Sequence, residues 1–408
     1  MTYTIILSLA LLTISGFAAG RMIKLVKLPA VSGYLLVGLL LGPSAINILD
    51  YDSVASLSNI FTNPILGIIV YMIGGNASAR ALAGFRKSIL LISIVEGSLA
   101  FVCASLLIIF MGPILLPDLS LSYIEWLATA IVIGSICIPT APAVSMAIVQ
   151  ELRATGPLPT TLLGVIALDN FLAIIAFAIC SSIAVAVIEG VIIGAISIFI
   201  NQVIEIIVSI AIGVLSAYLL SFTGRLIRNR PQRLVLVILV LVSTSVFTSA
   251  IGMYAILANL VLGVTIVNLS TNSTDYTEIL NPLKEIIFCI FFSLAGAHMD
   301  LQMMKSAGLL TGVIVIARDG GKFIGAWIGA TLSESADPVR KYLGLTLMPK
   351  AGVTIGLCML VTEIPQLEPI SAIVVTSVLA STLINELSAP PISKFALSKG
   401  TISSKQPG

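Results

Sequence analysis

Long apolar stretches alternate with short polar segments along the whole chain. Most of the stretches approach the roughly 20 residues that an α-helix needs to cross the hydrocarbon core of a bilayer. Because backbone groups in lipid must form their hydrogen bonds within the protein, we interpret the stretches as membrane-spanning helices. The pattern predicts thirteen spans, at approximately residues 4–20, 30–48, 59–77, 88–112, 125–149, 159–186, 203–222, 234–250, 254–269, 282–299, 307–331, 342–362 and 368–389.

The composition indicates an all-α polytopic membrane protein and excludes a soluble globular domain. Hydrophobic residues make up 58% of the chain and charged residues only 10%. The five cysteines are dispersed within apolar stretches without a CxxC pair, so we interpret them as small buried hydrophobic residues. The net charge of +2 gives no indication of nucleic-acid binding. No motif indicates a cofactor.

The distribution of Lys and Arg predicts the orientation of the chain in the membrane. Basic residues follow the first, third, fifth, seventh and eleventh predicted spans and occupy the C-terminal segment, whereas the opposite loops contain almost none. These residues are Arg21, Lys24, Lys27, Arg80, Arg86, Lys87, Arg153, Arg225, Arg228, Arg230, Arg233, Arg340, Lys341, Lys394, Lys399 and Lys405. The positive-inside rule then places the N-terminus outside and the C-terminus in the cytoplasm, as in a multi-pass protein of the plasma membrane. No basic segment precedes the first span, so we expect it to be retained and not cleaved as a signal peptide.

Thirteen spans divide into six, one and six. A copy that starts seven spans later enters the membrane from the other side, so residues 1–186 and 234–391 are predicted to be inverted repeats. Residues 187–233 then form a linker helix, and residues 392–408 form a short cytoplasmic tail. In a transporter core of this kind, the fifth span of each repeat is expected to be interrupted at a matching depth.

The fifth span of each half does contain residues that interrupt a helix. The first reads Cys-Ile-Pro-Thr-Ala-Pro and includes Pro139 and Pro142, and the second reads Met-Pro-Lys-Ala-Gly and includes Pro349, Lys350 and Gly352. Proline removes a backbone donor and glycine loosens the backbone, so both helices are expected to break near the middle of the membrane. Broken ends expose partial charges of about half a unit, which suit an ion site. The alternative is a pair of ordinary proline kinks.

Ionisable residues inside the apolar stretches are the main candidate functional residues. Asp169 and Asn170 lie at the middle of the sixth span, where a carboxylate costs about 2.5–3.5 kcal/mol on insertion scales. Such a group is retained when it lines a water-filled path or meets a partner. The eleventh span contains Arg318, Asp319 and Lys322 within five residues. Asp319 can neutralise either basic residue locally, and Asp169 is the expected remote partner of the remaining positive charge.

Four further polar residues are weaker candidates. Glu96 in the fourth span is expected either to balance positive helix ends at the break or to be a plain buried acid. Lys350 is expected to offset the negative partial charges of half-helix ends. Glu386, near the end of the last span, and His298, the only histidine, are both expected at the membrane interface. The alternative for His298 is a pH sensor, because histidine titrates near neutral pH.

Several motifs together resemble those of the cation/proton antiporter superfamily, specifically the sodium/proton exchanger type of its second family, CPA2. The matching segments are Gly33–Gly38 with Gly42–Ser44 (similar to GYLLxG…LGPS), Phe291–Ala297 with Asp300 (similar to FFxxxGxxxD), Gly321 and Lys322 with Gly325 (similar to the lysine motif of a core helix), and Thr140 (in the unwound crossing). The resemblance covers essentially the whole chain.

The resemblance implies a fold of the NhaA and NapA type, with two inverted six-helix repeats and crossed discontinuous helices. It implies a core of residues 88–186 and 307–391 that moves the ion between two openings in an elevator-like movement. It also implies a homodimer whose interface lies on the side of spans 1–3 and 8–10. The implied partners are a monovalent cation, with Na⁺ considered before K⁺ and Li⁺, together with the proton and the lipid bilayer.

The resemblance also implies roles for the site residues, and here the chain departs from the family. Asp169 is implied as the carboxylate for which cation and proton compete, Asn170 and Thr140 as neutral oxygen ligands of the cation, and Lys322 as the charge partner of the empty site. Electrogenic relatives have two consecutive acids and electroneutral relatives have Asn-Asp, whereas Asn170 of this chain offers a carbonyl oxygen but cannot release a proton. Three interpretations remain: Asp169 is the working residue, another acid has taken the role, or the chain is a neutralised variant. With one titrating carboxylate in the site, we expect weak or absent exchange.

Three other classes of function are alternatives to cation/proton exchange. The first is a sodium-coupled symporter of an organic anion with the architecture of bile-acid symporters, although few polar side chains accompany the two predicted breaks. An intramembrane enzyme is disfavoured because the sequence has no GxGD-like aspartate pair, no HExxH motif and no Ser paired with a His base. A gated channel with a cytoplasmic nucleotide-binding module is disfavoured by the short segment after the last span.

Overall fold

The chain folds into α-helices joined by short connections. The computed structural model describes residues 2–25, 30–75, 86–190, 195–227, 229–269, 276, 278–350, 352–362 and 364–401. These residues form sixteen α-helices and two 3-10 helices, and they contain no β-strand. The basic residues Lys27, Arg80, Arg228 and Lys405, which contribute to the predicted orientation, lie outside the described residues.

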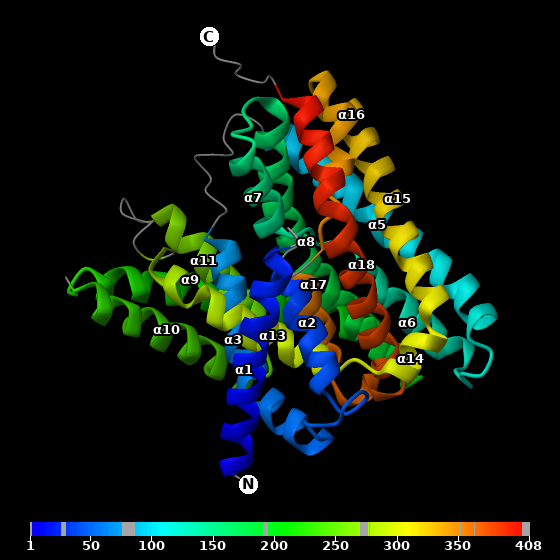
Figure 1. Ribbon diagram of the computed structural model, residues 1–408. Helices are drawn as coiled ribbons and strands as arrows, with labels where there is room; N and C mark the ends of the chain where they lie inside the picture. Colours follow the sequence, from blue (N-terminus) through cyan, green and yellow to red (C-terminus); the bar gives the residue numbers. More distant parts are fainter. Residues whose placement is uncertain are drawn as a thin grey trace. The chain divides into compact units, whose positions relative to one another are not determined.

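The helices group into two compact units, each built from two separate stretches of sequence (Figure 1). Unit 1 consists of Met1–Ala81 and Glu189–Gln302, and unit 2 consists of Leu82–Ile188 and Met303–Gly408. Each predicted repeat therefore contributes to both units. The inverted symmetry of the repeats and the linker role of residues 187–233 remain predictions.

Unit 1 contains helices from the start and the middle of the chain. They are α1 (Thr2–Leu25), α2 (Ala30–Leu41), α3 (Tyr51–Gly74), α9 (Ala195–Gly224), α10 (Arg230–Ala250), α11 (Ala255–Leu269), the 3-10 helix η3 (Glu278–Leu283) and α13 (Lys284–Ala297). The second predicted span reached residue 48, but α2 ends at Leu41 because Pro43 disfavours helical geometry at Gly42. Asp50 caps α3, and hydrogen bonds from Ser53 lower the pKa of the Asp50 carboxyl.

Unit 2 contains the two predicted discontinuous helices. Its members are α5 (Arg86–Leu115), α6 (Tyr123–Ile136), α7 (Pro142–Glu151), α8 (Pro157–Ile188), α15 (Gly308–Leu332), α16 (Asp337–Thr346), α17 (Gly352–Val361), the 3-10 helix η4 (Pro365–Leu367) and α18 (Glu368–Gly400), with the short α14 (Leu301–Ser306) at the boundary with unit 1. The predicted fifth span thus corresponds to α6 and α7, and the predicted twelfth span to α16 and α17.

Many of the helices have the length and composition of membrane spans. Seven helical segments among the described residues are long and apolar enough to cross a membrane, and the bent α3 would be an eighth. Four shorter apolar helices are α2, α6, α11 and α17. Helix α15 spans 25 residues but contains three ionisable residues near its middle. The structure therefore shows a polytopic membrane protein, while the count of thirteen spans remains a prediction.

Helices α5 and α15 pack closely along their lengths (Figure 1). The contact is made by a stripe of glycines four residues apart on α15, each of which faces the backbone of α5. An added Cβ atom would lie 2.8 Å from the Ala100 Cα at Gly321, 2.4 Å from the Glu96 Cα at Gly325 and 2.8 Å from the Ile92 Cα at Gly329. Small residues at this spacing let two membrane helices approach closely. The stripe therefore fixes the register of α5 against α15.

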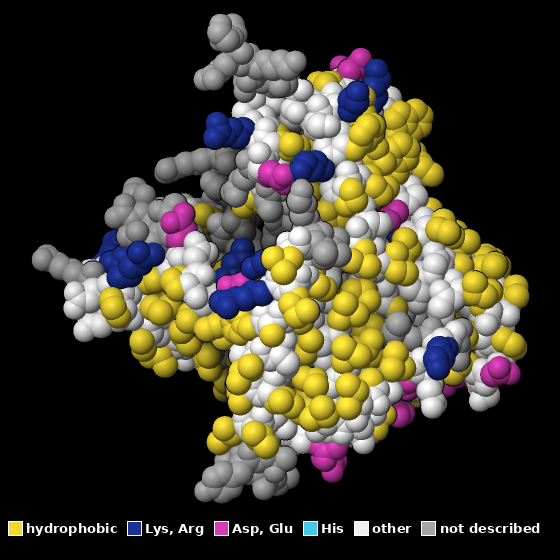
Figure 2. All heavy atoms as spheres, viewed as in Figure 1, with side chains coloured by type: hydrophobic (Ala, Val, Ile, Leu, Met, Phe, Trp, Pro, Cys, Tyr) yellow, Lys and Arg dark blue, Asp and Glu magenta, His cyan; other side chains and the backbone are white. Residues whose placement is uncertain are grey.

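The other face of α15 is apolar and exposed. Ile316, Phe323 and Trp327 project from it, each at least 40% exposed. Hydrophobic side chains cover much of the surface along α5 and α15 in the space-filling view (Figure 2). This surface is suited to contact with lipid tails, which replace water around a membrane helix.

The last helix is longer than the sequence predicts. The sequence predicts that the last span ends near residue 389, but α18 continues through Pro390 and Pro391 to Gly400. Its final turns are packed: the Ser393 hydroxyl donates to the Leu345 carbonyl at 3.3 Å, and Gly400 lies against the Leu158 side chain. Packing thus maintains the helix although the prolines remove two backbone donors. The predicted tail is helical as far as Gly400, and residues 402–408 lie outside the described residues.

The glycine stripe predicts that alanine substitutions at two glycines of α15, one inside the stripe and one outside it, have different effects on stability. Gly325→Ala places a methyl group against the Glu96 backbone, so we expect it to destabilise the protein by about 1–3 kcal/mol, a typical cost of overpacking. A Cβ atom added at Gly320 would meet open space. Gly320→Ala should therefore leave the stability of the protein unchanged or increase it by up to about 1 kcal/mol. Thermal unfolding in detergent measures both changes. Equal stability of the two variants would contradict the assigned packing.

Candidate functional site

The two discontinuous helices of unit 2 meet at their breaks. Helix α6 ends at Ile136 and α7 starts at Pro142, while α16 ends at Thr346 and α17 starts at Gly352. Pro139, Pro349 and Lys350 lie in the segments between these helices. The backbone N–H of Ala141 donates to the Pro349 carbonyl at 2.9 Å, so one hydrogen bond joins the two breaks. We call this region the crossing.

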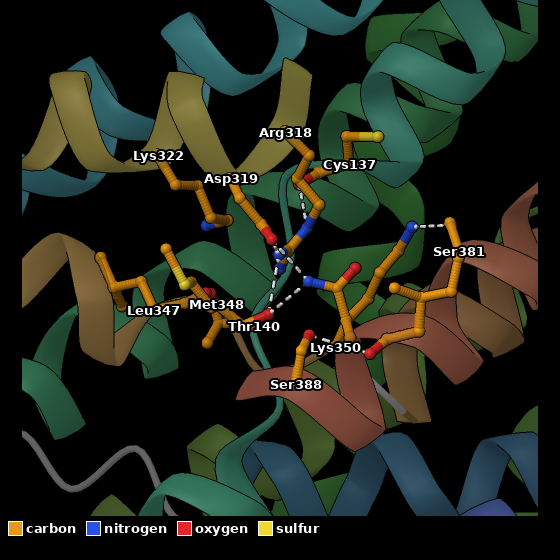
Figure 3. A network of polar contacts seen from close by, with 12 residues as sticks. Cys137, Thr140, Arg318, Asp319, Lys322, Leu347, Met348, Lys350, Ser381 and Ser388 are labelled. Atoms are coloured by element: carbon orange, nitrogen blue, oxygen red, sulfur yellow. Dashed lines mark hydrogen bonds and ion pairs between the residues drawn. The ribbon is translucent and has the colours of Figure 1, made fainter. Parts of the chain in front are cut away.

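Arg318 of α15 satisfies backbone carbonyl groups from both breaks (Figure 3). Its fully buried guanidinium donates from Nε to the Cys137 carbonyl at 3.1 Å, from Nη2 to the Pro139 carbonyl at 2.8 Å and from Nη1 to the Met348 carbonyl at 2.9 Å. Carbonyl groups at the C-terminal end of a helix lack intrahelical donors and have a negative partial charge. Arg318 therefore stabilises the ends of α6 and α16.

Lys350 lies in the break between α16 and α17, beside the half-helix ends, as the sequence predicts. Its role in offsetting their partial charges stays a prediction, and the hydrogen bonds to those carbonyl groups come from Arg318. The buried Lys350 ammonium donates instead to the Ser381 hydroxyl of α18 at 2.7 Å (Figure 3). The planar guanidinium of arginine presents several donors in a fixed geometry, which suits the three converging carbonyls better than a single ammonium group does.

Asp319 neutralises Arg318. Its Oδ1 accepts from Arg318 Nη1 at 2.8 Å, and its Oδ2 accepts from the Asn385 amide of α18 at 2.8 Å. The same amide also donates to the Met348 carbonyl at 3.3 Å. Of the two local pairings that the sequence allows for Asp319, the structure shows the one with Arg318. Lys322 is thereby left to acids on other helices.

Lys322 contacts two carboxylates at once. Its ammonium lies 2.8 Å from Glu96 Oε2 on α5 and 3.1 Å from Asp169 Oδ2 on α8, and all three side chains are fully buried. The expectation of one titrating carboxylate beside Lys322 is therefore wrong. Glu96 reaches the site because Gly325, one turn after Lys322, brings α5 against α15 at Glu96 itself. Two buried acids and one buried base form the centre of the site.

Thr140 and Asn170 connect Asp169 to the crossing. The Thr140 hydroxyl donates to Asp169 Oδ2 at 3.1 Å. The Asn170 amide donates to the Thr140 carbonyl at 3.2 Å and to the Ile166 carbonyl of its own helix at 2.8 Å. Asn170 thus holds the non-helical segment after α6 against α8. The structure brings together the predicted residues Thr140, Asp169, Asn170 and Lys322.

One oxygen of each of three side chains is buried without a hydrogen-bond partner in the described part of the chain. These atoms are Glu96 Oε1, Asp169 Oδ1 and Asn170 Oδ1. Two come from carboxylates and one from a neutral amide. Hard cations prefer oxygen ligands of this kind, and a buried oxygen without a donor is stabilised when a cation or a proton binds it. The three side chains therefore offer oxygens of the kind that ligate a small cation.

Two weaker candidates lie in different units. Glu386 is only 1% exposed and is packed inside the protein, in the interior of α18, while its position at the membrane interface stays a prediction. His298 caps the C-terminal end of α13 in unit 1 and is partly buried.

Sequence reasoning missed three parts of this site. Glu96 was not identified as a partner of Lys322, and Asn385 and Ser381 of α18 were not singled out. A usable signal for the first was present: the spacing of Gly321, Gly325 and Gly329 predicts a close partner helix for α15. The roles of the α18 residues had no comparable signal, because Ser and Asn are common in membrane helices.

Broken apolar helices that cross beside buried ionisable groups are typical of membrane ion transporters. Comparison with known families agrees: the family described as sodium/hydrogen exchanger, transmembrane, matches residues 7–395. The chain belongs to this sodium/hydrogen exchanger family.

A solved structure shows the same fold. The sodium proton antiporter MjNhaP1 from Methanocaldococcus jannaschii, determined at pH 8, superposes with a TM-score of 0.75 over 98% of this chain and 99% of its own. The two sequences are 17% identical, so the likeness concerns the fold alone. No curated protein sequence gives a significant match.

The ion pairs of Lys322 predict strong coupling between the three residues. Lys322→Ala leaves two buried carboxylates without their cation, which should cost about 3–5 kcal/mol of stability. Adding Asp169→Asn, and then Glu96→Gln, should recover part of the loss at each step. The exposed pair Lys24–Glu285 is the control, and Lys24→Ala should cost at most about 1 kcal/mol. Thermal unfolding of the single and combined variants measures the coupling free energy between these residues. Strictly additive losses in the free energy of unfolding would show that Lys322 does not pair with these acids.

Proposed function

We propose that the protein exchanges a monovalent cation, Na⁺ in the first instance, for protons across the plasma membrane. Family membership supports cation/proton antiport in general. The observation that supports this particular site is the Lys322 ammonium between Glu96 and Asp169, with one oxygen of each acid left without a protein donor. Cation and proton then compete for the same two carboxylates.

The charges of the site explain why exchange would be coupled. With both acids ionised and Lys322 protonated, the empty site has a net charge of −1. One bound monovalent cation, or one proton on either carboxylate, makes the site neutral. An uncompensated charge pays a large desolvation penalty in an apolar interior, so the two loaded forms can cross the membrane and the empty form cannot. This arrangement gives exchange of one cation for one proton.

Neutral oxygens complete the proposed cation site. The Asn170 carbonyl oxygen is a ligand without a protein donor, and the Thr140 hydroxyl, which contacts Asp169, is a second. Asn170 acts in this scheme as a ligand, and Glu96 supplies the acid that is missing at position 170. Exchange by the unmodified chain is therefore expected, in place of the weak exchange that a single carboxylate would give.

The proposed movement follows from where the site residues lie. All of them belong to unit 2, so an elevator-like displacement of this unit would move the site without separating its ligands. We further propose that unit 1 forms a homodimer interface.

The basic residues of unit 2 support the proposed orientation. At one end of this unit, Gly400 of α18 meets Tyr342 of α16, and the same end contains Arg340, Lys341 and Lys394. Lys and Arg side chains gather at that end in Figure 2, which supports placing it in the cytoplasm.

The structure disfavours symport of an organic anion. Such a substrate needs a basic side chain that is available to bind it. At the crossing, Arg318 donates to three backbone carbonyls and to Asp319, Lys322 contacts two acids, and Lys350 donates to Ser381. Each of these basic groups already has protein acceptors.

Transport by reconstituted protein tests the proposal. Proteoliposomes with an internal pH dye should show proton flux on addition of Na⁺, and clamping the membrane potential should leave the rate unchanged. Asp169→Asn should reduce the flux to the level of empty liposomes, and Glu96→Gln should reduce it strongly, because each removes a titrating acid. Asn170→Asp adds an acid and should make the rate sensitive to the potential.

Glu368→Gln, at the exposed start of α18, is the matched control. Full activity of Asp169→Asn would move the ion site to another helix.

A further inference from the structure

Glu386 of α18 is a buried acid that the site described above does not use. Its side chain is 1% exposed, and neither carboxylate oxygen has a hydrogen-bond partner among the described residues. Glu96 and Asp169 each have Lys322 as a partner. A carboxylate ion buried without any donor is strongly unfavourable, whereas the neutral acid provides an O–H donor of its own.

The charged groups on the elements packed against α18 have partners elsewhere. Elements α6, α7, α8, α15, α16 and α17 all pack against α18. Their charged groups near its central and C-terminal turns are Arg318 and Asp319 (paired with each other), Lys322 (with Glu96 and Asp169), Lys350 (with Ser381), Glu151 (with Lys394), and Asp337 (with Arg340 and Lys341). None of these ion pairs includes Glu386. The acid is thus not held in its charged form by a neighbouring cation.

Glu386 lies between the crossing and the basic end of unit 2. The preceding residue, Asn385, donates to Asp319 and to the Met348 carbonyl at the crossing. In the other direction, Lys394 is half exposed and pairs with Glu151 at the end of α7. Eight residues of helix separate Glu386 from Lys394, a distance of about 12 Å along the axis. An acid at this position is suited to receive or release protons between the crossing and that surface.

The local sequence makes this part of α18 easier to hydrate than an ordinary helix. Pro390 and Pro391 have no backbone N–H, so the carbonyl groups of Glu386 and Leu387 lose their usual intrahelical donors. Ser393 lies seven residues after Glu386 and therefore on the same face, and its hydroxyl donates to the Leu345 carbonyl at the C-terminal part of α16. The carbonyl groups of the turn that follows Glu386 can therefore accept hydrogen bonds from water.

We propose that Glu386 is a second proton-binding site of this protein. The carboxyl group holds a proton while the face of α18 toward α16 is closed. It releases that proton to water when this face is hydrated, which leaves a solvated carboxylate, and it takes the proton back on closure. Its use in transport rests on the cation/proton exchange proposed above, whereas the presence of the proton in the closed form does not.

Infrared spectroscopy of the purified full-length protein tests the proton directly. A protonated carboxyl group has a C=O stretching band separate from that of a carboxylate, and it shifts in heavy water. The difference spectrum between the unmodified chain and Glu386→Gln at neutral pH should contain this band. The difference spectrum for Glu368→Gln, an exposed acid on the same helix, should lack it. Glu386→Leu is a second variant that removes the acid without adding an amide. Absence of the band from both Glu386 difference spectra would overturn the proposal.

A second measurement tests the use of the proton in transport. Glu386→Gln has the shape of the neutral acid, so Na⁺ binding should be preserved, while the pH dependence of exchange in proteoliposomes should become shallower by the loss of one titrating group. An unchanged pH dependence would exclude Glu386 from the transport cycle. If the unmodified chain shows no exchange at all, the exchange function fails and the infrared result still decides whether Glu386 is protonated.

Discussion

The contact of one buried ammonium with two buried carboxylates is the constraint on which the rest of unit 2 depends. Lys322, Glu96 and Asp169 come from three helices, and none of them is tolerable in an apolar interior without the others. Helices α5, α8 and α15 therefore have to meet within hydrogen-bond distance at one depth. The glycine stripe of α15 provides the close approach of α5, and Thr140 and Asn170 hold α8 against the crossing.

The two cations of α15 have separate tasks, although they are only one turn apart. Arg318 donates to three carbonyl groups at the two breaks and is neutralised by Asp319, so it maintains the crossing. Lys322 contacts acids alone. Arginine suits the first task because its guanidinium stays charged and has a fixed fork of donors, whereas the lysine ammonium is a compact point charge that suits contact with two separate carboxylates.

The sequence was sufficient for the features that depend on local chemistry. Proline and glycine predicted both breaks, and the rarity of charge in apolar stretches singled out Asp169 and Lys322. Glu96 could not be assigned in the same way, because its partner depends on the register of α5 against α15, which sequence separation conceals. The last helix continues beyond its predicted end near residue 389, because packing of the last turns against α16 maintains it through Pro390 and Pro391. Local rules failed where tertiary contacts outweigh them.

Proton release on cation binding is the most direct test of the central claim that cation and proton compete for the two carboxylates beside Lys322. Na⁺ is added to purified protein in weakly buffered detergent solution, and the pH change is compared with that produced by choline. The account predicts release approaching one proton for each Na⁺ bound, with no release from the double variant Glu96→Gln, Asp169→Asn. Equal release from the double variant, or Na⁺ binding without proton release in the unmodified chain, would contradict it.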